Sequence, residues 1–221
     1  MKAISLFSGA GGDTVGMHKS GIDVVAFSEI DETAAKTHLE NFPDCEWIKH
    51  EGKADVAKIP NEAFQKYRGN VDIIFSGFPC QAFSHAGKKK ATEDPRGRLF
   101  LEFARITEYL KPKFIIGENV PGLLQRKVGE VRVFDTIVKT FEDLGYKVHY
   151  KVLDSSDFKT PQKRKRLFIV GHLEADFKFE FPEPTGRVNL SEFLEKTLEN
   201  AVEIQKIPKG LMFAHDKTIW P

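Results

Sequence analysis

The chain has 221 residues, of which 41% are hydrophobic, and its formal net charge at pH 7 is +1. This length and composition suffice for the core of one large domain, with or without a further segment. No apolar run approaches the roughly 20 residues that cross a bilayer, and the first residues lack the apolar region of a signal peptide. We therefore expect a cytoplasmic protein rather than a membrane or secreted one.

Basic residues are concentrated in two segments, although the net charge of the whole chain does not indicate a nucleic-acid partner. Residues 159–166 (KTPQKRKR) hold five lysines and arginines and no acid, and residues 87–98 hold five against two acids. Together these segments could form a footprint for phosphates. Solvated loops are the commoner outcome for a run of charges, so the pattern by itself leaves both alternatives open.

Apolar runs, helical periodicities and glycine or proline stops predict an alternation of strands and helices. Strands are expected at residues 2–7, 23–28, 71–76 and 114–117, with a weaker one near Trp47 and Ile48. Helices are expected at 13–20, from Asp31 to Phe42, at 98–110 and at 131–144. Two more strands, 146–153 and 166–171, are separated only by a loop, which favours an antiparallel pair.

This alternation predicts an α/β fold. We expect a Rossmann-like, doubly wound, mostly parallel sheet with a reversed edge strand and helices on both faces. The alternation of strand and helix patterns ends after Gly171. Residues 181–186 (FPEPTG) are typical of a linker, and residues 190–204 show helical spacing. We therefore divide the chain into a domain at 1–172 and a linker with the start of a further region at 173–221.

A glycine-rich turn, FSGAGG at residues 7–12, separates the first predicted strand from the first helix. Glycines permit a tight turn and the close approach of a ligand. Glu29 ends the next strand about 20 residues after Gly9, the separation at which nucleotide-binding folds place an acid on ribose hydroxyls. The turn lacks the Lys and Ser/Thr of a triphosphate loop, which suits a nucleoside without phosphates. A purely structural turn is the alternative.

The second motif, SGFPCQAFS at residues 76–84, directly follows a predicted strand. Ligands of open parallel sheets bind at the carboxyl ends of strands, so Cys80 stands where a nucleophile is needed, and Pro79 stiffens the backbone before it. A thiol must ionise to attack, and the basic segments could favour its thiolate. The alternatives are an inert thiol or a disulfide with Cys45, which a reducing compartment disfavours.

The third motif, IIGENVPG at residues 115–122, also follows a predicted strand. Glu118 is therefore expected at the same sheet edge as Cys80. An acid beside a nucleophile is typical of a general acid, whose protonated form burial favours. A capping or salt-bridged glutamate is the alternative.

The fourth motif is PQKRKRLFIVG at residues 161–171. Alternation along an extended chain puts Gln162, Arg164 and Arg166 on one face. Lys163 and Lys165 then share the other face. We predict that the first face points into the site and the second toward phosphate or solvent, with a basic surface patch as the alternative.

The order FSGAGG, Glu29, GFPCQAFS, DPRGRLF, ENV and PQKRKRLFIVG resembles the cytosine-5 DNA methyltransferases over roughly residues 1–172. The combination of PCQ, ENV and Q-x-R-x-R in one chain is highly specific. The resemblance implies the fold of S-adenosylmethionine-dependent methyltransferases, S-adenosylmethionine as the methyl donor with S-adenosylhomocysteine as its product, and duplex DNA as partner. It also implies a restriction–modification setting in a bacterium or phage, and no metal.

The resemblance implies a role for each matching residue. The catalytic residues are Cys80, Glu118, Arg164 and Arg166. The cofactor-binding residues are Phe7, Gly9, Ala10, Gly11, Gly12, Glu29, Ile30, Asp55, Val56, Phe78 and Pro79. The substrate-binding residues are Gln81, Ser84, Asn119, Val120 and Gln162.

The implied chemistry explains these residue types. Carbon 5 of cytosine is a poor nucleophile, and addition of the Cys80 thiolate at carbon 6 makes it electron-rich. A protonated Glu118 at ring nitrogen 3 and an arginine at the ring carbonyl would stabilise the developing charge. The base is out of reach inside a duplex, so it must be flipped into the pocket.

The sequence departs from the family pattern in two ways. Bacterial members continue with a target-recognition region and two further motifs, neither of which is found before Pro221, and Lys159 stands where the family often has Gly. The chain is then a fragment of a longer protein, one subunit of a split enzyme whose partner carries the recognition region, or an inactive copy.

Three other functions compete with DNA methylation. A tRNA cytosine-5 methyltransferase would share every motif. A silent cofactor-binding subunit would have no need of an intact Cys80, Glu118 and arginine pair. A cysteine hydrolase would need a histidine base such as His85, for which no orienting partner is evident.

Overall fold

The computed structural model describes residues 1–79 and 98–193. Cys80, Gln81 and Ser84 therefore lie outside the described residues. The same is true of the basic segment 87–98 up to its last residue, and of most of the helix expected at 190–204.

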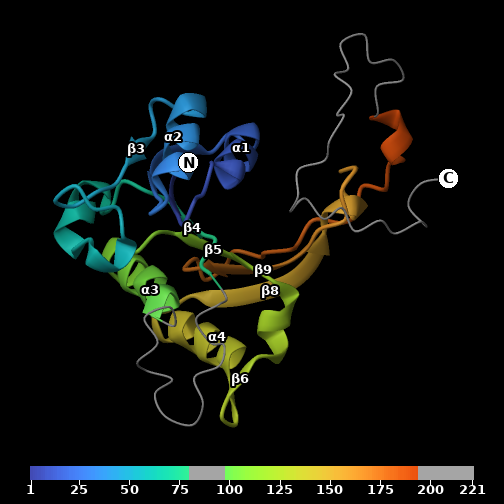
Figure 1. Ribbon diagram of the computed structural model, residues 1–221. Helices are drawn as coiled ribbons and strands as arrows, with labels where there is room; N and C mark the ends of the chain where they lie inside the picture. The colour runs from blue at the N-terminus through green and yellow to red at the C-terminus, as the bar shows by residue number, and fades with distance from the viewer. Residues whose placement is uncertain (80–97, 194–221) are drawn as a thin grey trace.

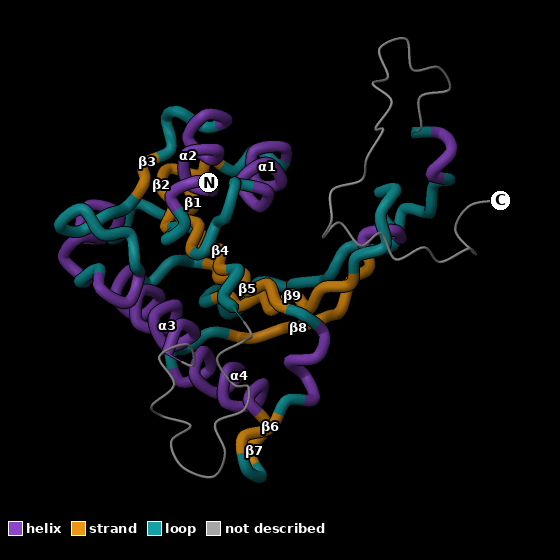
Figure 2. Tube along the Cα trace, viewed as in Figure 1, coloured by secondary structure: helices purple, strands orange, loops and turns teal. Residues whose placement is uncertain are grey.

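Seven strands form the central sheet of the described part, in the order β3-β2-β1-β4-β5-β9-β8 (Figures 1 and 2). They run over Lys2–Leu6 (β1), Asp23–Ser28 (β2), Glu46–Trp47 (β3), Ile73–Ser76 (β4), Phe114–Asn119 (β5), Lys147–Asp154 (β8) and Lys165–His172 (β9). Strands β1 to β5 pair in parallel, and β9 is antiparallel to both of its neighbours. The predicted α/β class with a mostly parallel sheet is confirmed.

The expected position of the reversed strand is wrong in one respect. The reversed strand is β9, which lies between β5 and β8 rather than at the edge. Its sequence RLFIVGH is almost continuously apolar and mostly buried, whereas KVHYKVLD of β8 alternates and is largely exposed. The more apolar strand takes the interior place because it is covered on both faces there, and the alternating strand takes the edge.

Helices cover both faces of the sheet, as expected for a doubly wound fold. The helices α1 (Gly12–Lys19) and α2 (Glu32–Asn41) lie on one side, and α3 (Arg98–Leu110) and α4 (Val133–Asp143) lie on the other (Figure 1). The connections hold the 3₁₀ helices η1 (Val56–Lys58), η2 (Asn61–Tyr67), η4 (Pro121–Gln125), η5 (Ser155–Asp157) and η6 (Leu190–Glu192), and a small hairpin of β6 (Lys127–Val128) and β7 (Val131–Arg132).

An aromatic cluster joins the sheet to α3 and α4. The Phe78 ring lies 5.8 Å from that of Phe100 and 6.1 Å from that of Phe103. The Phe103 ring in turn lies 4.9 Å from that of Phe141 on α4. Each of these rings is at least 95% buried, which contributes on the order of 2 kcal/mol per side chain. The cluster therefore anchors the backbone that leads from β4 to residue 80.

The segment after β9 returns along the β8–β9 pair. The Phe177 ring packs on Phe114, and the Phe179 ring packs on His149. Further along, Gly186 pairs with Phe158 in an isolated bridge. Residues 177 and 179 thus contact the sheet, and residues 181–186, expected as a linker, end in a contact with the connection between β8 and β9.

Lys159 adopts a left-handed backbone conformation with a φ of 55°. This conformation strains an L side chain by roughly 1–2 kcal/mol. We expect Lys159→Gly to raise the free energy of unfolding by about 0.5–1 kcal/mol in urea denaturation, since the relieved strain exceeds the added entropy of the unfolded chain. Lys163→Gly, at a residue whose φ is not positive, is the control and should give no gain. Equal losses in both variants would contradict the argument.

Candidate active site

Several of the predicted site residues in the described part lie at the carboxyl edge of the sheet. The strands β2, β1, β4 and β5 are neighbours in that order. Their ends lead into Glu29, the turn that starts at Phe7, the loop that starts at Gly77, and Glu118 with Asn119. The order in which successive strands are added to the sheet reverses between β1 and β4, and ligands of doubly wound sheets bind at such a point.

The glycine-rich turn is tied to Glu29. Phe7, Gly9 and Gly11 have φ values of 58°, 56° and 92°, so the turn is left-handed at three of its positions. The Gly9 amide donates to Glu29 Oε2 at 2.8 Å, and the Asp31 amide donates to Oε1 at 2.8 Å. A carboxylate has about four acceptor positions, so two stay open for hydroxyl groups of a ligand.

A buried histidine supports this turn from α2, which the sequence reasoning missed. His38 is fully buried and stacks on Phe27 with ring centroids 3.8 Å apart. A Cβ on Gly11 would come within 3.1 Å of the Phe42 ring and 3.2 Å of the His38 ring, and its φ of 92° strains any L side chain, so glycine is favoured there. The helical spacing of the sequence places His38 on the buried face of α2, but it does not reveal that Ser8 is the partner of the ring.

The hydrogen-bond network around His38 assigns its tautomer. Ser8 Oγ donates to Asp13 Oδ1 at 3.0 Å, and Ser5 Oγ donates to the other oxygen of the same carboxylate. Ser8 Oγ must then accept from His38 Nδ1–H, 3.2 Å away. His38 Nε2 is left to accept from the Thr14 hydroxyl at 3.3 Å. A neutral ring thus completes a chain of donors and acceptors beneath the turn.

Asn119 fixes the backbone that precedes Cys80. Its side chain is 3% exposed, and Nδ2 donates to the Phe78 carbonyl at 2.9 Å. Its Oδ1 accepts from the Val120 amide at 2.8 Å. Both ends of the amide are therefore engaged within the protein, and Asn119 holds the end of β5 to the loop after β4. Its expected contact with a substrate base stays a prediction.

Glu118 and the two arginines of the fourth motif come together across the β5–β9 pair. Arg166 Nε lies 2.7 Å from Glu118 Oε1, and Arg164 Nη2 lies 4.0 Å from the same oxygen. The Glu118 and Arg166 side chains are each 24% exposed, while that of Arg164 is 53% exposed. The predicted shared face of Arg164 and Arg166 is thus present, with a charged group held at the mouth of the site.

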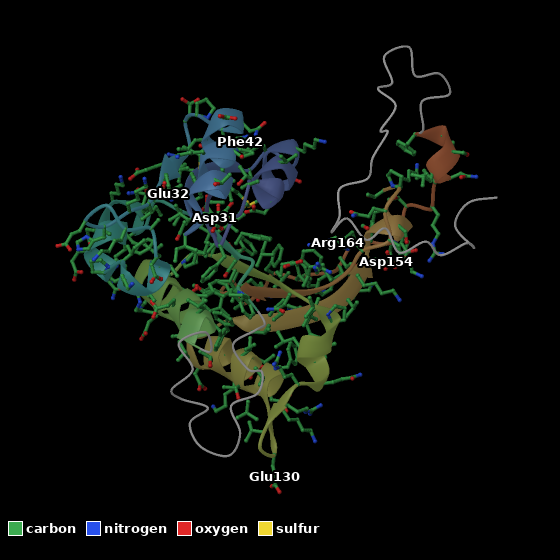
Figure 3. The ribbon with its side chains drawn as sticks, viewed as in Figure 1. Asp31, Glu32, Phe42, Glu130, Asp154 and Arg164 are labelled. Atoms are coloured by element: carbon green, nitrogen blue, oxygen red, sulfur yellow. The ribbon has the colours of Figure 1, made fainter. Side chains whose placement is uncertain are left out.

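Gln162, the third residue predicted on that face, lies in the turn before β9. Gln162 is exposed, and its carbonyl accepts from Ser155 Oγ at 2.5 Å. Ser155 Oγ also accepts from the Arg164 amide at 3.1 Å, which shapes the turn between β8 and β9. Figure 3 labels Arg164 and Asp154 at this end of the pair. The substrate contact predicted for Gln162 stays untested.

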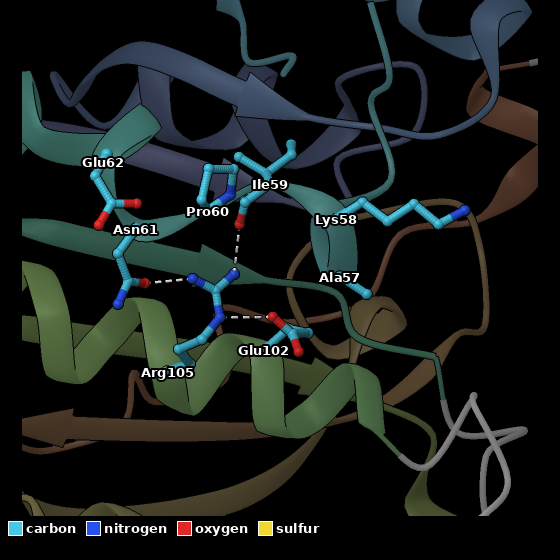
Figure 4. A pocket seen from close by; sticks show the side chains of 8 residues that line it. All are labelled: Ala57, Lys58, Ile59, Pro60, Asn61, Glu62, Glu102 and Arg105. Atoms are coloured by element: carbon cyan, nitrogen blue, oxygen red, sulfur yellow. Dashed lines mark hydrogen bonds and ion pairs between the residues drawn. The ribbon is translucent and has the colours of Figure 1, made fainter. Parts of the chain in front are cut away.

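Asp55 and Val56 lie in a segment held by α3. Asp55 Oδ1 accepts from the Ala57 amide at 3.2 Å and so caps η1, and Val56 is buried. A shallow hollow of about 450 Å³ lies between η1, the start of η2 and α3, and Arg105 reaches across it (Figure 4). The hollow is lined partly by charged side chains that already contact one another.

Cys45 is a buried thiol with no role in this site. Burial, helped by the nearby carboxylates of Asp13, Asp23 and Glu46, raises its pKa to about 12. It therefore stays protonated near neutral pH and is inert as a nucleophile. No group of metal-binding side chains is found within residues 1–79 and 98–193. No helix of the described part is long and apolar enough to cross a membrane.

The chain belongs to the C-5 cytosine-specific DNA methylase family, whose model matches residues 1–220. The Type II methyltransferase M.Eco47II of Escherichia coli is 42% identical over 198 residues, which make up 87% of this chain and 45% of that protein. The Type II methyltransferase M.AquIA of Picosynechococcus is 37% identical over 190 residues, covering 83% of this chain and 76% of that one.

Solved structures show the same fold. The crystal structure of a prophage-encoded DNA modification methyltransferase of Escherichia coli superposes with a TM-score of 0.64 at 30% identity, over 78% of this chain and 46% of that one. The DNMT2 of Spodoptera frugiperda gives a TM-score of 0.71 at 23% identity, over 90% of this chain and 60% of that one. The chain spans about half the length of several curated relatives that it matches.

The buried His38 makes stability depend on pH. Burial lowers its pKa below 6.5, although Asp13, the Gly9 carbonyl and Glu29 act in the opposite direction. As the pH falls through about 6.5, the unfolded chain takes up a proton that the folded chain refuses. The free energy of unfolding therefore falls by up to about 1.4 kcal/mol per pH unit, until the lower folded pKa is reached.

His38→Gln should flatten this dependence between about pH 5 and pH 7 in urea titrations, whatever the variant's overall loss of stability. His50→Gln is the control, because that side chain is 44% exposed in the loop after β3, and its slope should equal that of the parent chain. A slope for His38→Gln equal to that of the parent chain would contradict the assignment of a neutral His38.

Proposed function

We propose that this chain is the catalytic part of a DNA (cytosine-5-)-methyltransferase, transferring a methyl group from S-adenosylmethionine to carbon 5 of a flipped cytosine through an adduct with Cys80. The observation that carries this is Glu118 held by Arg166 at the edge where the Asn119–Phe78 bond orients the backbone before Cys80. An acid, an arginine and a nucleophile segment at one sheet edge suit addition to a polarised ring.

The residues of the turn fit the nucleoside part of the cofactor. Glu29 retains acceptor positions for ribose hydroxyls while it orders the Gly9 amide. Ile30 is 65% exposed directly after it, so an apolar surface is available to a flat base. Asp55 and Val56 would contact the adenine. S-adenosylmethionine, when bound, supplies an electrophilic methyl group on a sulfonium.

The chain's own residues supply the activation of the cytosine. The Cys80 thiolate adds to carbon 6 and forms a carbon–sulfur bond, and the electrons of the ring move toward nitrogen 3. Glu118, after taking up a proton from solvent, donates it to nitrogen 3, and Arg166 fixes the orientation of its carboxyl group. Arg164, which is 53% exposed beside Glu118, would contact the ring carbonyl. After methylation the carbon 5 proton passes to a water molecule and Cys80 leaves as a thiolate, while nitrogen 3 returns its proton to Glu118.

The partner that fits this site is duplex DNA, with its target base flipped out. Lys163 and Lys165 are exposed on the face opposite Arg164 and Arg166, where phosphates could be bound. We assign catalysis to residues 1–172 and a linker with the start of a recognition or docking region to 173–221. Target recognition is then supplied by a continuation of the chain or by a second subunit, in a cytoplasmic restriction–modification system.

The first test is methyl transfer from labelled S-adenosylmethionine into mixed-sequence duplex DNA by the purified 221-residue chain. Wherever label is incorporated, we expect the transfer to be abolished in Cys80→Ser and retained in Cys45→Ala, which removes the inert thiol. A folded chain without activity would leave DNA methylation to an assembly with a recognition region. Activity of Cys80→Ser would refute the assignment of Cys80 as the nucleophile. Transfer into tRNA but not into DNA would show that RNA, rather than DNA, is the substrate.

Glu29→Ala tests the cofactor site. Removing a charged acceptor of two ribose hydroxyls should weaken S-adenosylhomocysteine binding about 10- to 100-fold in calorimetry, since a hydrogen bond to a charged group contributes about 1.5–3 kcal/mol. Glu32→Ala is the matched control, because that side chain is 77% exposed in the first turn of α2. Unchanged affinity in Glu29→Ala would count against the ribose contact.

A further inference from the structure

The segment that carries Asp55 and Val56 has little regular structure of its own. It follows β3 and holds the three-residue η1 before Pro60 and η2. A 3₁₀ helix this short leaves carbonyl groups near its end with weak partners or none. The hydrogen bond from the Ile59 amide to the Val56 carbonyl is long, at 3.3 Å, and therefore weak. The shape of the segment must therefore be imposed from outside.

Arg105 of α3 supplies the missing partners (Figure 4). Its Nη2 donates to the Ile59 carbonyl at 2.9 Å and to the Val56 carbonyl at 3.3 Å. Its Nη1 donates to Asn61 Oδ1, and its Nε contacts Glu102 Oε2 at 2.7 Å. One planar guanidinium thus bridges both ends of η1 and the start of η2, and the carboxylate one turn back on α3 holds it in place.

This clamp acts on the side chain expected at the adenine. Asp55 caps η1 through Oδ1, so the direction of its carboxylate follows the orientation of that helix. Arg105 sets this orientation by holding the carbonyls of Val56 and Ile59, on either side of the turn. Asp55 Oδ2 contacts the exposed Lys58 amine at 3.3 Å and retains acceptor capacity for a ligand amino group.

The helix that carries Arg105 also supports the segment of the nucleophile. Phe100 and Phe103 of α3 pack on Phe78, two residues before Cys80. The clamp at Arg105 lies on the same helix, less than two turns beyond Phe100. A single rigid element therefore contacts both the adenine end of the site and the backbone that leads to the thiol.

We propose that Arg105 is a positioning residue that sets the adenine-recognising orientation of Asp55 and joins it, through α3, to the backbone at Phe78. The inference rests on the proposed function. A purely structural clamp would lower stability alone, whereas a positioning residue changes how the site discriminates between bases. The two roles are therefore separable by measurements on ligands that differ only in the base.

The test compares S-adenosylhomocysteine with S-inosylhomocysteine, in which a carbonyl replaces the amino group of the base. Calorimetry on the full 221-residue chain should show tighter binding of the adenosyl ligand by about tenfold or more, as expected for loss of one hydrogen bond to a charged group. In Arg105→Met we expect the adenosyl affinity to fall toward the inosyl affinity. Arg105→Lys, which keeps the charge but not the fork, should fall in between.

Two variants serve as controls. Arg68→Met removes another arginine that contacts α3, through the Tyr109 ring at 5.1 Å, and should retain the full preference. Glu29→Ala should weaken both ligands equally and also retain it, because it acts at the ribose.

Each outcome has a distinct meaning. Arg105→Met that is less stable but keeps the preference would overturn the inference, as would failure of both Arg105 variants to fold. A parent chain that binds S-adenosylhomocysteine without preference would overturn it while the proposed function stands. A parent chain that binds neither ligand would overturn both.

Discussion

The pairing of β5 with β9 is the constraint on which the candidate site depends. Glu118 of β5 lies opposite Phe168 in the register, so Arg166, two residues away on β9, is its diagonal neighbour on the same face. If β9 lay at the edge, Arg166 would be roughly 10 Å away across two strand spacings. The same pairing places Asn119 at the end of β5, where it reaches the Phe78 carbonyl.

The other half of the site depends on polar groups that pair with one another around the glycine-rich turn. The turn from Phe7 to Gly12 is left-handed at several positions, which costs free energy unless its surroundings hold it. Glu29 holds it from the next strand, and a neutral His38 holds it through Ser8. A turn ordered in this way before a ligand arrives loses little further entropy when the ligand binds.

Helix α3 connects the backbone at Phe78 with the segment after β3 that carries Asp55. Its apolar face enters the aromatic cluster around Phe78, and its Arg105 holds the carbonyls of the segment after β3. The interior around Phe78 is close-packed, so a shift of α3 would be felt at both contacts. Packing also explains why Cys45 is not a nucleophile. Its thiol is buried and desolvated, which raises its pKa and keeps it protonated.

Local patterns along the chain were enough to predict most of the helices and strands, the class of fold and several residues of the site. The strand predicted at 23–28 and the helix at 98–110 match Asp23–Ser28 and Arg98–Leu110, because hydrophobic periodicity and stop residues act over a few neighbours. The carboxyl-edge rule also brought Glu29 and Glu118 to one edge of the sheet.

The position of β9, the His38–Ser8 contact and the contacts of Arg105 with Val56 and Ile59 became known only from the folded chain. His38 and Ser8 are 30 residues apart, and Arg105 and Val56 are 49 apart. Such contacts depend on which faces pack together and on which buried donors lack acceptors. Those quantities are properties of the assembled core, and no local window of sequence contains them.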